Sequence, residues 1–338
     1  MPTSTRLVTS EKLNKGKLKT RTIELKRKMK MLENRSLPVI VLLVLLALPA
    51  SAQSKLDVVT TLPDLQNIVE SIGGERVEAS SIATGYQNPH FVDPKPSHIR
   101  KLSRADMFVT VGLDLTTGWV PPLLTSSRNS SIQPGGSGYI DASVNVPLLQ
   151  VPSSVSREQG DIHVFGNPHY WLDPAIGHVI AHNIFDGLVR IQPESEDYFR
   201  ANLEAFDTAL DAKIVEWQEM MAPFAGTDII AYHNQWPYFE TAFDLRIAEF
   251  LEPKPGIPPT PSQLAKVIDM MEGQNIDVII ISPYFKADSA ELVVRSAGGQ
   301  VVTLATSVAA FDEIVTYFDL FDYNVNALVN AFSAKAGD

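Results

Sequence analysis

Short apolar runs alternate with segments of helical spacing along most of the chain beyond Gln53. The apolar runs predict strands at residues 58–61, 77–82, 107–111, 139–141, 228–232, 246–251, 277–281 and 301–304. Helices are predicted between them at residues 62–72, 97–105, 118–124, 236–243, 261–272, 287–296 and 311–332. The remainder of residues 125–167 is rich in Ser, Gly and Pro and is expected to be loop. Such alternation is typical of an α/β protein.

One much longer helix is predicted between Pro193 and Met221. Its apolar positions follow one another at steps of three or four residues, the spacing of one helix face: Phe199, Leu203, Phe206, Leu210, Ile214, Trp217 and Met221. At 1.5 Å per residue this helix spans roughly 40 Å, long enough to run along two lobes. The predicted fold is therefore α/β, with two α/β lobes joined by a long helix.

The amino-terminal segment has the order of an export signal. Residues 1–36 carry 11 Lys or Arg and 3 Asp or Glu, residues 37–48 are all apolar or Pro, and Ala50-Ser51-Ala52 follows. A basic region, a short apolar stretch and a small-x-small site define a signal peptide, and this stretch is short for a membrane span of about 20 residues. We predict removal of residues 1–52, with an uncleaved anchor as the alternative. Met29 and Met31 are alternative starts to Met1.

Removal of this segment changes the charge of the protein. The remaining 286 residues carry 17 basic and 36 acidic side chains, a net charge of −19 against −11 for the whole chain. Nucleic acid and anionic membranes are therefore poor partners. The chain has no cysteine, which excludes a disulfide scaffold, a Cys-ligated zinc finger, a thiol enzyme and a lipid anchor at the new terminus. We expect a freely soluble monomer in the periplasm.

Three of the seven histidines lie where an α/β lobe places functional loops: His90, His169 and His233. His90 and His169 each end an Asn-Pro-His sequence, in which proline restricts the backbone. His233 directly follows a predicted strand. Neutral imidazole is the commonest zinc ligand, and three imidazoles with one further donor make a tetrahedral site. Taken alone, a histidine is more often a surface or hydrogen-bonded residue than a metal ligand.

The other histidines have less distinctive surroundings. His98 is expected to be exposed near the start of a helix. His178 and His182 are one helical turn apart, a spacing that can bind metal, but no acidic partner is evident in the sequence and a solvated helix face is favoured. His163 is expected to be an exposed loop residue, with metal delivery or a role as a further ligand as the alternatives.

Three histidine segments carry a family resemblance. They are Pro89-His90 followed by Asp93-Pro94-Lys95-Pro96-Ser97, the run Asn167-Pro168-His169-Tyr170-Trp171-Leu172-Asp173-Pro174, and Tyr232-His233 before Trp236, Tyr238 and Phe239. In this order, and over nearly all of the chain beyond residue 53, they resemble the three histidine motifs of the zinc and manganese solute-binding proteins of ABC transporters.

The resemblance implies two α/β lobes joined by a long rigid helix, with one metal ion in the cleft between them. We place the lobes at residues 54–193 and 223–338 and the linking helix at residues 194–222. The family's three ligands correspond to His90, His169 and His233. Manganese members of the family tend to carry a carboxylate at the third position, and manganese prefers oxygen donors. The expected ion is therefore Zn²⁺ rather than Mn²⁺ or Fe²⁺.

The fourth ligand is where this sequence departs from the family. The family usually offers a carboxylate after the last core strand, which corresponds here to residues 304–307, and no acid stands there or in residues 281–284. Either water completes the site or an acid from another loop does, for which Glu252 is the candidate. Zinc-transport members often carry a His- and acid-rich loop between the first two ligands, and here that loop holds His163 alone.

The resemblance implies a periplasmic zinc-binding protein, not an enzyme, that delivers Zn²⁺ to an inner-membrane ABC permease. A periplasmic metal-loading protein is a further expected partner. Two alternatives stay open: a manganese- or iron-binding member of the same family, and a secreted zinc hydrolase, because three histidines and a water also form a catalytic zinc site. The hydrolase would need a general base, and the sequence has no His-Glu-x-x-His segment.

Overall fold

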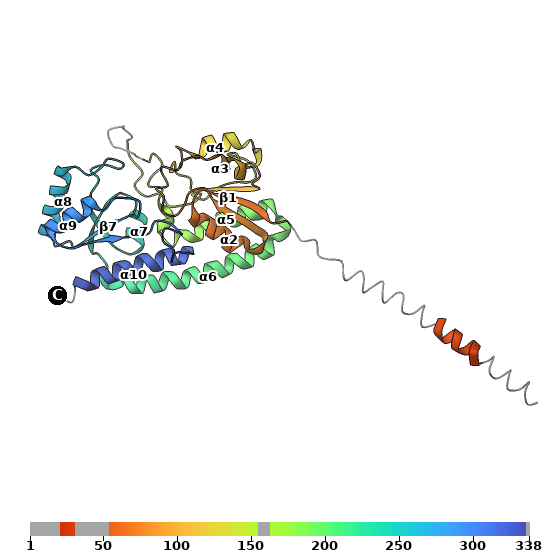
Figure 1. Cartoon of the computed structure of the whole chain (residues 1–338). Coiled ribbons are helices and arrows are strands. Elements are labelled where there is room, and N and C mark those ends of the chain that lie inside the picture. Colours follow the sequence, from red (N-terminus) through yellow and green to blue (C-terminus); the bar gives the residue numbers. More distant parts are fainter. Residues whose placement is uncertain (1–20, 31–53, 155–162, 336–338) are drawn as a thin grey trace, which may run out of the picture. The chain divides into compact units, whose positions relative to one another are not determined.

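A computed structural model describes residues 21–30, 54–154 and 163–335 of the chain (Figure 1). The chain divides into two compact units, Met1–Ser54 and Lys55–Asp338. In the first unit, residues 21–30 form a helix whose side chains are all exposed. The apolar run of the predicted signal peptide and its predicted cleavage position lie outside the described residues.

The second unit begins with a parallel four-stranded sheet of order β2-β1-β3-β4. Its strands are β1 (Leu56–Thr60), β2 (Val77–Ser81), β3 (Met107–Thr110) and β4 (Tyr139–Asp141). In the register of the sheet, Val58 pairs with Ala79 on one side and with Met107 on the other. The carboxyl ends of these strands therefore meet at one edge, where the loops that follow them can form a site.

Helices cover both faces of this sheet: α2 (Pro63–Gly73), α3 (Pro96–Leu102), α4 (Val120–Ser127) and α5 (Ile176–Ile191). In Figure 1, α3 and α4 lie on the opposite side of the sheet from α2 and α5. The approach of α5 to β4 is close, because a Cβ added to Gly187 would lie 2.4 Å from Ile140 Cδ1. Only glycine lets this helix pack so tightly against the sheet.

A second parallel sheet, of order β6-β5-β7-β8, forms the carboxy-terminal lobe. Its strands are β5 (Asp228–Ala231), β6 (Arg246–Phe250), β7 (Val278–Ile281) and β8 (Gln300–Thr303), and its helices are α7 (Pro237–Ala242), α8 (Pro261–Gln274) and α9 (Asp288–Ala297). Proline occupies the first or second position of α2, α3, α4, α7 and α8, where no backbone donor is needed.

Two long helices join the lobes. The 26-residue α6 (Glu196–Met221) packs against α2 and α5 of the first lobe, and α10 (Tyr317–Lys335) packs along α6 and against β8 of the second (Figure 1). The ring of Trp217 on α6 lies 5.1 Å from that of Phe321 on α10, and both Trp217 and Lys213 donate to the carboxylate of Asp322. The predicted apolar stripe of α6 is buried except at Ile214.

One large hydrophobic cluster includes residues of both lobes. Residues of the first lobe, of α6 and of α10 pack in one cluster with Ile229 and Ala231 of β5. The intervening Ile230 points to the other face of its sheet, where it joins a separate cluster with α8 and α9. The two lobes are thus fastened by shared apolar packing and not by the linking helix alone.

The structure differs from the predicted elements at several helix ends. The long helix begins at Glu196, because Pro193–Ser195 forms a 3-10 turn. The last helix begins at Tyr317 and not near residue 311. At its start, the Asp319 carboxylate accepts from the backbone N–H of Thr316, and the Thr316 hydroxyl accepts from the backbone N–H of Asp319. His178 and His182, which were expected on a helix face, lie on α5, Ile176–Ile191, whose bounds were not predicted.

Candidate metal centre

His90 lies in the loop that follows β2. The side-chain oxygen of Asn88 accepts from the backbone N–H of His90 at 3.0 Å, and the Pro89 carbonyl accepts from the indole of the buried Trp119 at 3.0 Å. Asparagine makes such local turns readily, and the proline between the two residues narrows the backbone choices further. The Asn-Pro-His sequence thus fixes the direction in which the imidazole leaves the chain.

His169 is positioned by the same sequence and is 1% exposed. The side-chain oxygen of Asn167 accepts from the backbone N–H of His169 at 3.1 Å and from its ring Nδ1 at 2.9 Å. The side chain of Asn167 in turn donates, at 2.9 Å, to the carbonyl of Asn234, which directly follows His233 in the carboxy-terminal lobe. The amide oxygen can only accept, so the proton of His169 lies on Nδ1 and Nε2 keeps its lone pair.

His233 follows β5 in the carboxy-terminal lobe. Its Nδ1 lies 2.6 Å from Glu252 Oε2, which also accepts from the backbone N–H of Gly256 at 3.2 Å. Both His233 and Glu252 are buried. Glu252, the fourth ligand suggested by the sequence, therefore stands behind His233 and orients its ring, as the second partners of metal-binding histidines do.

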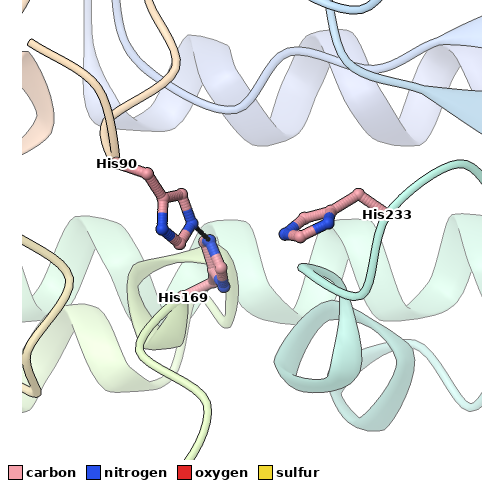
Figure 2. Close-up of side chains that lie close together, drawn as sticks. All are labelled: His90, His169 and His233. Atoms are coloured by element: carbon pink, nitrogen blue, oxygen red, sulfur yellow. Dashed lines mark hydrogen bonds between the residues drawn. The ribbon is translucent and has the colours of Figure 1, made fainter. Parts of the chain in front are cut away.

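The three imidazoles meet between loops of both lobes (Figure 2). His90, His169 and His233 each offer a ligand nitrogen within 4.8 Å of the others, and no other such group occurs among residues 21–30, 54–154 and 163–335. The Nε2 atoms of His90 and His169 are 3.2 Å apart. Two nitrogens bound to one tetrahedral Zn²⁺ at 2.0–2.1 Å lie about 3.3 Å apart, so this pair is already spaced for an ion.

Burial keeps His90 and His169 neutral. Desolvation, and then repulsion from His163 and His233, lowers the pKa of His90 to about 3. Desolvation, followed by repulsion from His90, His233 and His163, lowers the pKa of His169 well below its ordinary value. A metal ion competes with protons for imidazole nitrogen, and at neutral pH the rings of His90 and His169 each keep one unprotonated nitrogen that can bind it.

A fourth histidine lies beside this group. The ring of His163 is 5.0 Å from that of His90 and 6.1 Å from that of His169, measured between centroids, and its side chain is 17% exposed. Its Nδ1 lies 2.5 Å from Asp114 Oδ1. The exposed loop position expected for His163 is therefore wrong. Asp114, 49 residues away in sequence, carried no signal that would have linked it to this site.

The remaining histidines lie elsewhere. His98 is half-buried rather than exposed, and its Nδ1 accepts from the backbone N–H of Lys95, the residue that caps α3. His178 and His182 do face acids, contrary to the sequence expectation: Asp207 of α6 lies 2.7 Å from His178 and 3.0 Å from His182. These two histidines thus clasp α5 to α6.

The loops that follow β7 and β8 bring no carboxylate into the group, as expected. Ser282 accepts from the side chain of Gln235, and Ser307 donates to the buried carboxylate of Asp64 in α2. Burial raises the pKa of Asp64 to about 6. The carbonyl of Thr306 accepts from the indole of Trp171, next to His169, at 2.9 Å. The contacts of Thr306 and Ser307 tie the loop after β8 to the amino-terminal lobe.

Two α/β lobes on a shared long helix, with three histidines converging from both lobes, define a two-lobed ion-binding protein. Residues 58–331 match the family described as the periplasmic component A of the zinc-uptake complex. The chain therefore belongs to this family, and it is a substrate-binding protein of a metal ABC transporter.

The relatives and structural neighbours agree with this assignment. The metal ABC transporter substrate-binding lipoprotein SloC of Streptococcus mutans is 23% identical over 291 residues, 84% of this chain and 92% of that protein. The manganese-binding lipoprotein MntA of Halalkalibacterium halodurans is 25% identical over 285 residues, 82% and 89% of the two chains.

A crystal structure of ZnuA has a TM-score of 0.71 at 24% identity and covers 82% of this chain and 99% of that one. The SBP FpvC from Pseudomonas aeruginosa in complex with Mn²⁺ has a TM-score of 0.71 at 22% identity, covering 83% of this chain and all of that one (100%). These likenesses confirm the predicted fold of two α/β lobes joined by a long helix. Within the described parts of the chain, no helix combines the length and the apolar character needed to cross a membrane.

Proposed function

We propose that this protein binds Zn²⁺ through His90, His169 and His233 and delivers it to an inner-membrane ABC permease. The observation that carries the proposal is the group of three ligand nitrogens within 4.8 Å, contributed by both lobes and containing no carboxylate. Imidazole suits zinc, whereas manganese and magnesium favour carboxylate and water oxygens. A binding protein that holds Mn²⁺ or Fe²⁺ instead is the competing possibility, and the names of several relatives favour manganese.

The hydrolase alternative lacks a suitable base. The two carboxylates that lie near the histidines, Asp114 and Glu252, each contact an imidazole Nδ1 and so hold rings in place. A general base would instead have to face the ion-bound water. The family, too, consists of transport proteins.

We also infer export by the segment of residues 1–52 and function as a monomer outside the cytoplasm, with a metal-loading protein as a further partner. The relatives are named as lipoproteins, whereas this sequence contains no cysteine to carry an acyl anchor. We therefore favour a protein that is free of the membrane surface. Fractionation of cells into soluble periplasm and membrane would decide between the two.

The metal preference is tested by competition titration of the purified protein with Zn²⁺ and Mn²⁺ against a chromophoric chelator. Wild-type protein should bind one equivalent of zinc and prefer it to manganese, and His90→Ala/His169→Ala should abolish high-affinity binding. The matched control is His178→Ala/His182→Ala, which removes the same number of imidazoles from the surface clasp between α5 and α6. Equal zinc affinity in wild type and the His90/His169 variant would refute the site, and a preference for Mn²⁺ would refute the zinc assignment.

A further inference from the structure

The proposed site has three nitrogen donors but no evident fourth. A closed tetrahedral zinc site takes four protein ligands. The loops after β7 and β8 offer none, and Glu252 is engaged with His233 Nδ1 and the Gly256 N–H. A fourth protein donor would therefore have to come from another side chain that lies near the three histidines.

We propose that His163, held by Asp114, is the fourth ligand of the metal ion and joins the other three when the ion binds. This inference rests on the proposed function, because it adds a donor to the same site. The His163 ring lies 5.0 Å from His90 and 6.1 Å from His169 between centroids. It stands outside the group whose nitrogens all lie within 4.8 Å, so it must move inward to bind.

The hydrogen-bonding pattern of His163 is that of two of the three proposed ligands, His169 and His233. An oxygen faces Nδ1 in His169, in His233 and in His163: Asn167 Oδ1, Glu252 Oε2 and Asp114 Oδ1 at 2.9, 2.6 and 2.5 Å respectively. An oxygen acceptor at Nδ1 holds the proton there and leaves Nε2 with a lone pair for metal. His178 lacks this pattern, because acids face both of its ring nitrogens.

Asp114 grips the segment of His163 with both carboxylate oxygens. While Oδ1 faces the imidazole, Oδ2 accepts from the backbone N–H of Val164 at 3.0 Å. The side chain of Asp114 is 19% exposed, so the contact is shielded from solvent on most sides. Asp114 is thus a positioning residue that keeps His163 next to the group before the ion arrives.

The backbone that presents Asp114 is strained. Gly112, Leu113 and Asp114 follow β3 with consecutive positive φ angles of 71°, 47° and 61°. The left-handed region is unfavourable for a residue such as leucine, and backbone in this state is retained where the surrounding structure enforces it, often at functional sites. A surface ion pair alone would not require this conformation.

Binding of the ion by His163 would also change the preference of the site for zinc over manganese. A fourth imidazole would give a site of four nitrogens, which favours zinc over manganese more strongly than three nitrogens and a water. The absence of an acid in residues 304–307 would then reflect replacement of the usual carboxylate by His163, from a different loop.

The test compares His163→Ala and Asp114→Asn with His169→Ala and, as a surface control, His182→Ala in the purified protein. His163→Ala should still bind one equivalent of zinc but at least 10-fold more weakly, since loss of a supporting partner alone costs roughly 10–100-fold. Asp114→Asn should weaken zinc binding in the same direction by a smaller factor. The visible absorption bands of bound Co²⁺ should change in His163→Ala, and added imidazole should restore them in His163→Gly.

The outcomes separate the two proposals. If His169→Ala abolishes zinc binding while His163→Ala keeps wild-type affinity within twofold and an unchanged Co²⁺ spectrum, the fourth-ligand inference is overturned and the zinc function stands. If wild type itself fails to bind zinc, the proposed function fails first. Circular dichroism of each variant checks folding, and a folded His163→Ala with weakened binding and an altered Co²⁺ spectrum supports the inference.

Discussion

The protein holds two groups of histidines that differ in burial and in partners. His90, His169 and His233 come from three separate loops, lie close to one another, and expose little of their rings. His178 and His182 come from one helix turn and face Asp207, and the side chain of His182 is 59% exposed. The first group has ligand nitrogens close enough to one another to bind a single ion, while three of the four ring nitrogens of the second face carboxylates.

The spacing of histidines in the sequence is therefore a poor guide to metal binding in this protein. The pair one turn apart on α5 has the more familiar metal-binding spacing. Its ring nitrogens are nevertheless taken up by the acids of α6, and a charge-assisted contact there needs no ion. The three loop histidines have no sequence spacing in common, yet the fold brings their nitrogens together in a buried place.

The largest expected effect is the loss of zinc affinity when Glu252, the partner of His233 in the buried group, is changed. Glu252→Gln removes the negative partner of His233 Nδ1 and should weaken zinc binding about 10–100-fold. Glu249→Gln is the matched control, because Glu249 lies on neighbouring β6 and pairs with Lys266 instead of a histidine. Competition titration measures both, and equal affinities in the two variants would show that Glu252 has no role in positioning.

An intermediate effect is expected on stability in acid. The folded-state pKa of His90, about 3, lies below its ordinary 6.5. Between these values the unfolded chain binds a proton that the folded protein does not, so the free energy of unfolding falls as the pH falls below 6.5. The slope is up to about 1.4 kcal/mol per pH unit for each histidine that stays neutral. His169 contributes in the same direction.

Asp64 acts in the opposite direction. Its pKa is raised to about 6, so the folded protein gains a proton before the unfolded chain does, and stability rises as the pH falls from 6 toward 3.8. Urea unfolding of metal-free wild type and His90→Ala/His169→Ala at pH 7 and 4.5 isolates the histidines, because both proteins keep Asp64. The variant should lose less stability on acidification, and identical losses would contradict the neutral burial of the two rings.

The smallest effect is expected at the surface group. Asp207→Asn weakens the clasp between α5 and α6 and should lower the free energy of unfolding by about 0.2–1 kcal/mol, the range of exposed ion pairs. Zinc affinity should stay within twofold of wild type. A larger drop in zinc affinity would show that the clasp and the buried group are coupled, and would break the distinction between them.

Much of the fold could be predicted from local patterns. All eight predicted strands are present in the described residues, with ends within two residues of those expected. Parallel strands buried on both faces are short continuous apolar runs, which stand out from the amphipathic helices between them. A helix face was expected at His178 and His182, but the bounds of α5 were not predicted, although its buried positions have helical spacing.

The candidate site could be predicted only in part. Asn88 and Asn167 sit two residues before His90 and His169, so the turns that orient both histidines are local and visible in the sequence. The side chains that face Nδ1 of His233 and of His163 lie far from these histidines in the sequence. Glu252, 19 residues from His233, was expected as a ligand and instead contacts the His233 ring. Asp114 is 49 residues from His163, and nothing in its segment marks the pairing.

Local sequence patterns are enough to predict the strands, the long helix with its apolar stripe, and the loop positions of the three histidines. Each of these features depends on residues within a few positions of one another. Tertiary structure alone decided which nitrogens meet, which histidines are neutral, and which carboxylates face them. Those properties depend on burial and on contacts between distant segments, and the shared core that spans α6, α10 and both lobes sets them.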